Sequence, residues 1–430
     1  MPNDTIEARI PASCPASISE ILHHAWNHNL ADLKPLLNVP GRASVQEPTT
    51  GETPLHAAIR SCGARIPDDN NKNDAASATV DIEAAKAVVH ELFLSGAIWN
   101  DVDSNNETPG CVAARLGQDD LYNLCVGAGM RAELLFGLLD GYEELESDVE
   151  DEDMDEDEGE NEGTEDQQDA PEDIILESDP DRAFSPPQAE ERTVTSAVYL
   201  RSNVTYSDGK LVDDAQNGVM MAWETSIMRS SVDALIPGLA AGKRVLNIGF
   251  GMGIIDTMFR ETQPSRHHII EAHPEVLKHI ESSPDCTFGK TWEASGPAEG
   301  AFKIHAGKWQ EVVPKLLEQG ELYDAIYFDT FGEDYSQLRM FFTEYVPAML
   351  DEGGVFGFFN GLGADRKVCY DVYTKVVEMH LTDAGLDLEW NEIDVDMKGL
   401  EEEGKGEWQG VKRRYWTLDK YRLPIITLMG

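Results

Sequence analysis

The chain has 430 residues, of which 80 are acidic and 34 basic, and its formal net charge at pH 7 is −46. This length exceeds that of most single domains, so we expect two domains joined by a linker. The strong negative charge argues against direct binding of nucleic acid or of an anionic membrane, and it favours a basic protein partner or a cationic substrate.

The six cysteines are scattered and form no C-x-x-C pair, which indicates reduced thiols and neither a disulfide framework nor a zinc site. The N-terminus lacks the basic and then apolar layout of a signal peptide, and no run of 18 apolar residues predicts a membrane span. We therefore expect a soluble protein of the cytoplasm and nucleus, and we expect it to be a monomer.

Residues 1–140 contain two copies of a pattern that predicts a pair of helices. The first copy opens with TPLHAA at 53–58 and closes with LFLSGA at 92–97, and a degraded second copy opens with TP at 108–109. The pattern resembles the ankyrin repeat, in which threonine caps the first helix, proline occupies its first turn and the histidine, here His56, ties neighbouring loops together. We expect an ankyrin-like helical domain; an unrelated helical bundle is the alternative.

The two copies are further apart than one repeat length. Pro54 and Pro109 are separated by 55 residues, whereas ankyrin repeats have a period of about 33. The stretch 64–79 is polar and rich in Asp and Asn, so we interpret it as an insertion that accounts for the excess. We interpret the segment 30–37 (LADLKPLL) as the end of an earlier, incomplete repeat.

The negative charge is concentrated in residues 141–190. Between Glu143 and Arg182 there are 22 acidic residues and a single arginine. Such a run cannot bury apolar surface and repels itself, so we expect 141–190 to be a disordered, extended linker that includes the proline-rich 185–187.

Residues 191–430 alternate between predicted strands and helices. A DG pair at 208–209 between two β-prone runs predicts a hairpin, and MMAWETSIMRS at 220–230 has a helical pattern. A long helix is expected over 365–384. The expected strands are 245–248, 267–270, 302–305, 323–328, 355–359, 386–393 and 414–418. This order predicts an α/β fold with a mostly parallel, seven-stranded sheet covered by helices on both faces, and the short acidic link 398–409 favours an antiparallel final hairpin.

The run VLNIGFGMGII at 245–255 predicts a buried strand that enters a tight turn and then a helix. Its glycines, Gly249, Gly251 and Gly253, follow the spacing G-x-G-x-G and not the G-x-G-x-x-G that cradles a dinucleotide pyrophosphate. A side chain at these positions would keep a cofactor away from the backbone. The next strand ends in Glu271, 22 residues after Gly249, where a carboxylate suits the two hydroxyls of a ribose. The pattern is similar to that of S-adenosylmethionine-dependent methyltransferases and disfavours a dinucleotide site.

Three acidic residues are expected to meet at the carboxyl ends of the strands, where ligands of such sheets bind. They are Glu271, Asp329 at the end of the fourth strand, and Glu224 on the segment before the glycine turn. Two carboxylates flanked by aromatic rings suit a planar guanidinium, which offers a fork of N–H donors. A guanidinium has no free lone pair, so its methylation requires a carboxylate that draws off charge and a proton. We assign Asp329 as the proton acceptor and Glu224 as the clamp.

These residues also have structural interpretations. Glu224 is consistent with a solvated helix residue, and Asp329 with a cap of the following turn. Trp309 suits the core as well as it suits stacking near an adenine, and Lys308 suits the surface. The acids expected at the rim of the site are Glu333 and Asp334. Neighbouring residues of a strand point to opposite faces, so we expect no metal site among the clustered histidines His267, His268, His273 and His279.

Five motifs occur in the order MMAWETSIM, VLNIGFGMGI, IIEAHP, GKWQEV and IYFDTF. Together they resemble guanidinoacetate methyltransferase and its fungal relatives, the type IV protein arginine N5-methyltransferases (the arginine N-methyltransferase 2 family), from Thr195 to the C-terminus. The upstream ankyrin-like region and acidic linker match only the fungal enzymes. The resemblance implies a Rossmann-like class I methyltransferase fold with S-adenosylmethionine as the cofactor. It places the cofactor contacts on Tyr206, Met220, Glu224, Gly249, Phe250, Gly251, Met252, Gly253, Ile254, Glu271, Ala272, His273, Lys308, Trp309 and Asp329.

The same resemblance implies methylation of the δ (N5) nitrogen of an arginine in a protein substrate, such as a basic ribosomal protein. The ordinary arginine methyltransferases carry a pair of glutamates on a loop after the fourth strand and a T-H-W turn, and this chain has neither. A small-molecule guanidine methyltransferase is the first alternative, but it would not need the N-terminal repeats. An ankyrin scaffold that merely binds the cofactor is the second, and the presence of both Glu224 and Asp329 argues against it.

Overall fold

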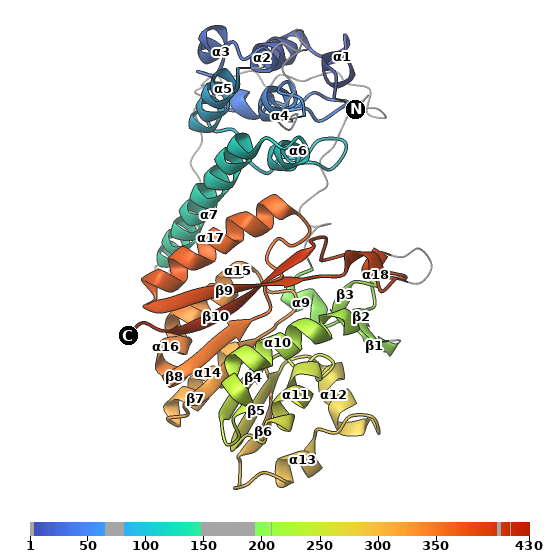
Figure 1. The fold of residues 1–430 in the computed structure, drawn as a ribbon, viewed down its shortest axis with the longest axis vertical. Coiled ribbons are helices and arrows are strands. Elements are labelled where there is room, and N and C mark those ends of the chain that lie inside the picture. Colours follow the sequence, from blue (N-terminus) through green and yellow to red (C-terminus); the bar gives the residue numbers. More distant parts are fainter. Residues whose placement is uncertain (1–3, 65–80, 148–193, 208, 402–405, 413) are drawn as a thin grey trace, which may run out of the picture. The chain divides into compact units, whose positions relative to one another are not determined.

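The computed structural model describes residues 4–64, 81–147, 194–207, 209–401, 406–412 and 414–430. The chain divides into two compact units, Met1–Pro186 and Pro187–Gly430, which we call the helical unit and the sheet unit (Figure 1). The insertion expected at 64–79, apart from Ala64, and most of the linker expected at 141–190 lie outside the described residues. Among the helices of the described ranges, none is long and apolar enough to cross a membrane.

The helical unit is a succession of helices, most of them short. They are α1 (Ile6–Arg9), α2 (Ala16–Trp26), α3 (Leu30–Leu36), the 3-10 turn η1 (Arg42–Ser44), α4 (Pro54–Arg60), α5 (Ile82–Leu94), α6 (Pro109–Arg115) and α7 (Asp119–Ser147). Helix α7 continues through Ser147, so the linker expected to begin at 141 starts inside a helix. The first residues of the expected linker, 141–147, include leucine and several glutamates, which have high helix propensity.

The two TP motifs cap helices as expected. The Oγ1 atom of Thr53 accepts a hydrogen bond from the backbone N–H of His56 at the start of α4 (3.3 Å), and Thr108 caps α6 in the same way (3.2 Å). Burial and the charge of Arg60 lower the pKa of His56 to about 3, so its ring is neutral. Its Nε2 lies 2.9 Å from the carbonyl oxygen of Glu107. His56 therefore links the loop before α4 to the loop before α6.

The sheet unit is built on a seven-stranded sheet with the strand order β6-β5-β4-β7-β8-β10-β9. Its strands are β4 (Arg244–Ile248), β5 (Arg266–Glu271), β6 (Phe302–Ala306), β7 (Tyr323–Phe328), β8 (Leu350–Phe358), β9 (Leu386–Asp394) and β10 (Lys420–Leu428). Strands β4 to β8 pair in parallel, and β10 is antiparallel to both β8 and β9. The mostly parallel α/β sheet and its antiparallel final hairpin are confirmed, and this arrangement is that of a Rossmann-like class I methyltransferase fold.

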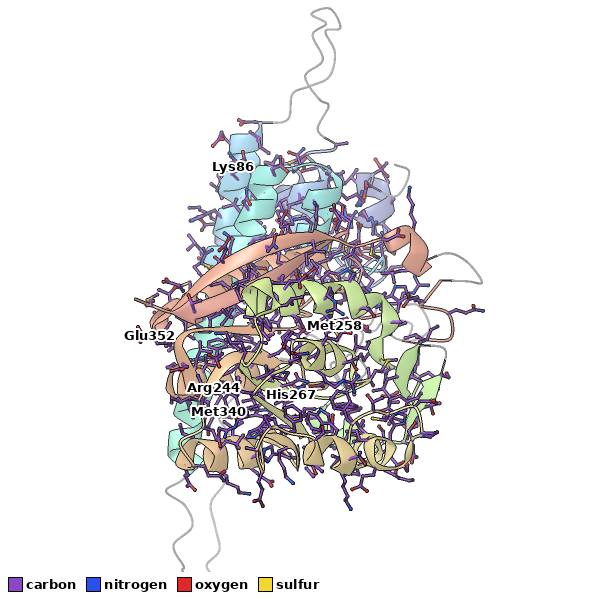
Figure 2. The ribbon with its side chains drawn as sticks, turned by 60° about the horizontal axis from the view of Figure 1, so that its bottom comes forward. Lys86, Arg244, Met258, His267, Met340 and Glu352 are labelled. Atoms are coloured by element: carbon purple, nitrogen blue, oxygen red, sulfur yellow. The ribbon has the colours of Figure 1, made fainter. Side chains whose placement is uncertain are left out.

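Alternate residues of the central strands pack on opposite faces of this sheet. Val245 of β4 and Tyr327 of β7 lie in a core with helices α10 (Thr225–Leu235) and α11 (Ile254–Glu261). Leu246 and Phe328, the next residues along the same strands, lie in a second core with α14 (Trp309–Glu318) and α17 (Lys367–Asp383). Figure 2 shows the side chains that fill the sheet unit, among them the labelled Met258 of α11. Burial on both faces explains the continuous apolar runs of these strands.

A small antiparallel sheet precedes the large one. Its strands are β1 (Val204–Ser207), β2 (Lys210–Asp213) and β3 (Gly218–Met221). Ser207 pairs with Lys210, so β1 and β2 form the hairpin that the DG pair predicts. The remaining elements are α9 (Ser196–Tyr199), η2 (Ala222–Glu224), η3 (Pro237–Leu239), α12 (Pro274–Ser282), α13 (Lys290–Ala294), α15 (Tyr335–Met340), the π-helical turn η4 (Phe341–Tyr345), α16 (Val346–Met349) and α18 (Met397–Glu401).

Two expected elements are wrong. Met220 and Met221 belong to β3, and the α-helix expected over 220–230 begins only at Thr225 because the intervening residues form a 3-10 turn. The strand expected at 414–418 is not formed. Trp416 of that segment is fully buried in an aromatic and aliphatic cluster, and the last strand follows it as β10. In both places tertiary packing overrides the local pattern.

Candidate active site

A cavity of about 260 Å³ lies at the carboxyl ends of the parallel strands. Its wall comes from the loops that follow β4, β5, β6, β7 and β8, and strand β3 with the turn η2 closes another side. Ligands of doubly wound sheets bind in this position, because several loops converge there above one edge of the sheet.

The turn after β4 requires glycine because its backbone adopts left-handed φ angles. Gly249, Gly251 and Gly253 have φ angles of 95°, 54° and 69°, which lie in the left-handed region that favours glycine. A Cβ on Gly249 would lie 1.9 Å from the carbonyl oxygen of Asp329, and one on Gly251 would lie 2.7 Å from the Cε of Met220. Asp329 and Met220 therefore exclude a side chain at these glycines. This reason adds to the one expected from the sequence, namely that a side chain would keep a cofactor away from the backbone.

Glu271 ends β5 and fastens the glycine turn. Its Oε2 accepts a hydrogen bond from the N–H of Phe250 (2.9 Å), and its Oε1 accepts one from the N–H of His273 (2.6 Å). Burial raises the pKa of this carboxyl, although the N–H groups oppose the shift. Oε2 also accepts a hydrogen bond from the N–H of Gly251 (3.4 Å), and the residue lines the cavity. Glu271 thus orients the turn and presents its carboxylate at the cavity wall.

Glu224 and Asp329 form the acidic part of the cavity wall. Glu224 is 2 % exposed, and its Oε1 accepts hydrogen bonds from the N–H of Met221 (3.0 Å) and from the hydroxyl of Tyr415. Asp329 follows β7 and is half-buried because it borders the cavity, but its Oδ2 is covered and has no hydrogen-bond partner among the described residues. Burial raises the pKa of both carboxyls, and the charge of Asp329 raises that of Glu224 further.

This pair of carboxyls is unfavourable without a ligand. A buried acceptor that lacks a hydrogen bond costs about 1–3 kcal/mol, more when it is charged. A cation with several N–H donors, bound in the cavity beside Asp329 and Glu224, would lower the pKa of both groups. The arrangement therefore suits a cationic donor group, as the sequence predicts.

Trp309 begins α14 and is mainly a core residue. Its ring makes edge contacts with Phe328 and Phe341 at centroid distances of 5.8 and 5.4 Å, and its indole N–H donates to Glu333 (3.0 Å). It also borders the cavity, together with Glu333 and the exposed Lys308. Trp309 therefore packs in the core and also forms part of the cavity wall, and Glu333, expected at the rim, accepts the hydrogen bond from its ring.

The clustered histidines have separate partners. His267 contacts Asp256 (2.9 Å), His268 contacts Tyr323 (2.7 Å), and His273 contacts the carbonyl oxygen of Tyr199 (3.0 Å). His279 stacks on Tyr206 with the ring centroids 3.9 Å apart. Within the described ranges no group of three or more potential ligands is placed to hold a metal ion.

The structure separates the expected site residues into two sets. Those that line the cavity are Met220, Glu224, Gly249, Gly251, Glu271, Ala272, Lys308, Trp309 and Asp329. Those that are not among its lining residues are Tyr206, Phe250, Met252, Gly253, Ile254 and His273. Two residues of the second set make hydrogen bonds that stabilise the glycine turn. The hydroxyl of Tyr206 donates to the carbonyl oxygen of Gly251 (3.0 Å), and the N–H of Met252 donates to the sulfur of Met220 (3.2 Å).

Three aromatic residues of the wall were not expected from the sequence. Tyr199 precedes the small sheet, Phe359 follows β8, and Tyr415 lies in the irregular segment before β10. None of them belongs to one of the five motifs. Tyr415 is 191 residues away from Glu224, so only the tertiary fold brings the two together.

Comparison with known proteins identifies the family. The family model for guanidinoacetate N-methyltransferase matches residues 201–389. The protein arginine N-methyltransferase 2 of Neurospora crassa is 62% identical over 435 residues, which cover 100% of this chain and 99% of that protein. The enzyme of the same name from Gibberella zeae is 60% identical over 97% of this chain and 94% of its own length. This chain belongs to the protein arginine N-methyltransferase 2 family.

More distant members of the protein arginine N-methyltransferase 2 family match over the same length. The Aspergillus fumigatus protein is 43% identical over 96% of both chains. Among solved structures, the O-methyltransferase TomG from Streptomyces achromogenes has a TM-score of 0.33 at 14% identity, covering 49% of this chain and 82% of that one. Spermidine synthase from Thermotoga maritima has a TM-score of 0.35 at 13% identity, covering 53% of this chain and 72% of that one.

Proposed function

We propose that this chain transfers the methyl group of S-adenosylmethionine to the δ (N5) nitrogen of an arginine in a basic protein, such as a ribosomal protein. The observation that carries the proposal is the pair of carboxyls beside the glycine turn, the buried Glu224 and the half-buried Asp329. An arginine side chain is a planar cation with five N–H donors and matches two acceptors that face one cavity.

The residues around the glycine turn fit S-adenosylmethionine. Gly249 and Gly251 expose backbone at the cavity wall, Glu271 presents its carboxylate there for a ribose hydroxyl, and Lys308 is a cation suited to the carboxylate of the cofactor. When bound, the cofactor supplies a methyl group on a sulfonium, which makes the methyl electrophilic.

The two carboxylates have different tasks in the proposed reaction. Glu224 clamps the guanidinium and limits its rotation, so that the reacting nitrogen stays aligned with the methyl group. A new N–C bond forms at the δ nitrogen as the bond from carbon to sulfur breaks, and the proton of that nitrogen passes to Asp329 and then to solvent. The raised pKa of Asp329 suits this task, because a base accepts a proton best when its pKa is near the working pH.

The charge of the cavity wall favours a protein arginine over guanidinoacetate. The lining residues include four acids, Glu224, Glu271, Asp329 and Glu333, and one base, Lys308. A substrate with its own carboxylate would compete with the cofactor for Lys308 and would be repelled by the acids. An arginine within a protein chain presents only the cation.

We assign substrate recognition to the helical unit, as an ankyrin-like domain. The support is the order of its helices, in which α2 and α3, α4 and α5, and α6 and α7 follow one another in pairs, and the contact of His56 with the loop before α6. Stacked repeats of this kind offer an extended recognition face without chemistry of their own. We further propose that the protein acts as a monomer in the cytoplasm and nucleus.

The proposal is tested by incubating the purified chain with labelled cofactor and three substrates: an arginine peptide, a basic protein extract and guanidinoacetate. We expect label in the peptide and the extract. Fragmentation of the product by mass spectrometry then distinguishes δ-methylarginine from the ω form. Label in guanidinoacetate alone would support the small-molecule alternative, and ω-methylarginine would overturn the N5 assignment.

A further inference from the structure

The segment between α18 and β10 packs onto the small sheet beside the cavity. We call the described residues 406–412 and 414–418 the crossing segment. Glu407 of this segment accepts a hydrogen bond from the N–H of Trp223 (2.9 Å), and the N–H of Lys412 donates to the carbonyl oxygen of Gln216 (2.8 Å). These bonds join residues almost 200 positions apart and fix the crossing segment above β3 and η2.

Aromatic packing fixes the position of Tyr415 within this segment. Its ring lies 5.0 Å from that of Trp408, at an angle of 88°, and 6.1 Å from that of Trp223. The next residue, Trp416, is fully buried and donates from its indole N–H to the carbonyl oxygen of Leu418 (2.6 Å). A phenol ring held on several sides can place its hydroxyl in one position only.

That hydroxyl meets Glu224. Oε1 of Glu224 accepts from Tyr415 and from the N–H of Met221, which occupies both of its lone pairs. Within the described residues Oε2 makes no hydrogen bond, and it is the oxygen left for the substrate. We propose that Tyr415 is a positioning residue, which fixes Glu224 and favours its ionised form so that Oε2 can bind the guanidinium; this rests on the proposed role of Glu224 as the clamp.

The charges around Glu224 make such a partner necessary. Asp329, at the end of β7, and Glu407, in the crossing segment, both raise its pKa, while the hydrogen bonds from Tyr415 and Met221 lower it. Tyr327 of β7 and Tyr421 of β10 also interact electrostatically with Glu224. Without the Tyr415 hydroxyl, Glu224 would stay protonated to higher pH, and a neutral carboxyl binds a cation weakly.

The test is the pH profile of kcat/KM for an arginine peptide with Tyr415→Phe. Because a hydrogen bond to a charged group is lost, we expect kcat/KM at pH 7 to fall by about 10- to 100-fold. We expect the acid limb of the profile to move up by at least about one pH unit. The matched control is Tyr323→Phe, which removes a buried hydroxyl bonded to His268 (2.7 Å) at the opposite end of β7 and should leave the profile in place.

A second readout does not depend on turnover. The protons released when the arginine peptide binds in the presence of S-adenosylhomocysteine can be counted by calorimetry in buffers of different ionisation enthalpy. Tyr415→Phe should release more protons than the unaltered chain between pH 8 and pH 9, because there the unaltered Glu224, whose pKa is raised to about 8, is partly ionised and the variant carboxyl is more fully protonated beforehand. Equal proton release, or a fall in kcat/KM that is uniform across pH, would overturn the inference and leave Tyr415 a packing residue.

The Glu224→Gln variant separates this inference from the proposed function. Loss of turnover in Glu224→Gln with an unshifted profile in Tyr415→Phe would refute only the role of Tyr415. Near-normal turnover in Glu224→Gln would instead refute the clamp itself. In the Glu224→Gln background, adding Tyr415→Phe should leave the proton release on peptide binding unchanged, because the titrating group is gone.

Discussion

Replacing Asp329 by Asn should separate charge from shape at the proposed catalytic base. The amide has nearly the same size, but it cannot accept the proton released by the guanidinium. Loss of a general base typically lowers kcat by about 10²- to 10⁴-fold, and we expect Asp329→Asn to fall in this range. Cofactor affinity should weaken only modestly, because most of the expected cofactor contacts, among them Gly249, Gly251 and Glu271, are unchanged.

The same substitution should stabilise the fold, and only at higher pH. Burial raises the pKa of Asp329 in the folded state. The stability that the protonated carboxyl contributes is therefore fully present below the pKa of Asp329 in the unfolded chain. It is lost as the pH rises through the pKa of Asp329 in the folded chain. Asn does not lose a proton. Relative to the unaltered chain, Asp329→Asn should be similar at pH 5 and more stable at pH 8 by about 1–3 kcal/mol, the range for a buried group without a partner. For a unit of this size, each kcal/mol moves Tm by about 2–4 °C.

Asp324, near the start of β7, provides a control because its pKa is shifted in the opposite direction. Burial raises its pKa, but hydrogen bonds and charge from Arg244, whose Nε lies 2.9 Å away, lower it overall. Its stabilising effect is therefore present above the unfolded pKa, and Asp324→Asn should lower Tm at pH 8 and less so at low pH. Thermal melts of both variants at pH 5 and pH 8, with single-turnover rates, test the argument. Near-normal turnover in Asp329→Asn would remove this residue from the mechanism, and a pH-independent Tm difference would refute its proposed ionisation.

Three further outcomes are expected. Glu271→Ala should weaken S-adenosylmethionine binding by about 1.5–3 kcal/mol in calorimetry, because charged hydrogen bonds to the ligand and the tie to Phe250 are both lost; unchanged affinity would mean that the ribose is held elsewhere. Gly249→Ala should abolish cofactor binding, since its Cβ would lie 1.9 Å from the carbonyl oxygen of Asp329; a variant that binds normally would show that the turn can move. A fragment that begins at Glu191 should fold, bind the cofactor and methylate a short arginine peptide, while it loses activity on a protein substrate, most clearly at low salt; equal loss on both substrates would make the N-terminal residues part of the catalytic fold.

The sequence was most informative where local pattern and tertiary structure agree. Residues 245–255 combine an apolar run, three glycines and a following helix, and all of these reflect one strand, turn and helix of the structure. Glu271 and Asp329 end strands whose limits are visible from their apolar runs, so their convergence follows from the topology of the sheet. The TP motifs were equally clear, because capping involves only neighbouring residues.

The remaining features depend on contacts between distant residues. Met220 and Met221 are compatible with a helix or a strand, and pairing with β2 decides between them. Pro424 lies inside the last strand, where its lack of an N–H argues against a strand in a sequence pattern. Tyr415 has no local signal, since its function depends on a crossing segment that returns to Glu224. Phe250 shows the reverse case: it lies in the most recognisable motif but packs edge-on against Phe288 (5.4 Å), and it is not among the residues that line the cavity.

The contact between Gly249 and Asp329 constrains how this enzyme can change over generations. The N–H of Asp329 donates to the carbonyl oxygen of Ile248 (2.8 Å), and the carbonyl oxygen of Asp329 occupies the space that any side chain at position 249 would need. A side chain at position 249, on the cofactor side of the pocket, would therefore displace the acid on the substrate side as well. We expect a change at one position to need a compensating change at the other. An engineer who seeks a new methyl acceptor should leave both this junction and Tyr415 unchanged and vary the neighbouring residues of the crossing segment, which comes from a separate part of the chain.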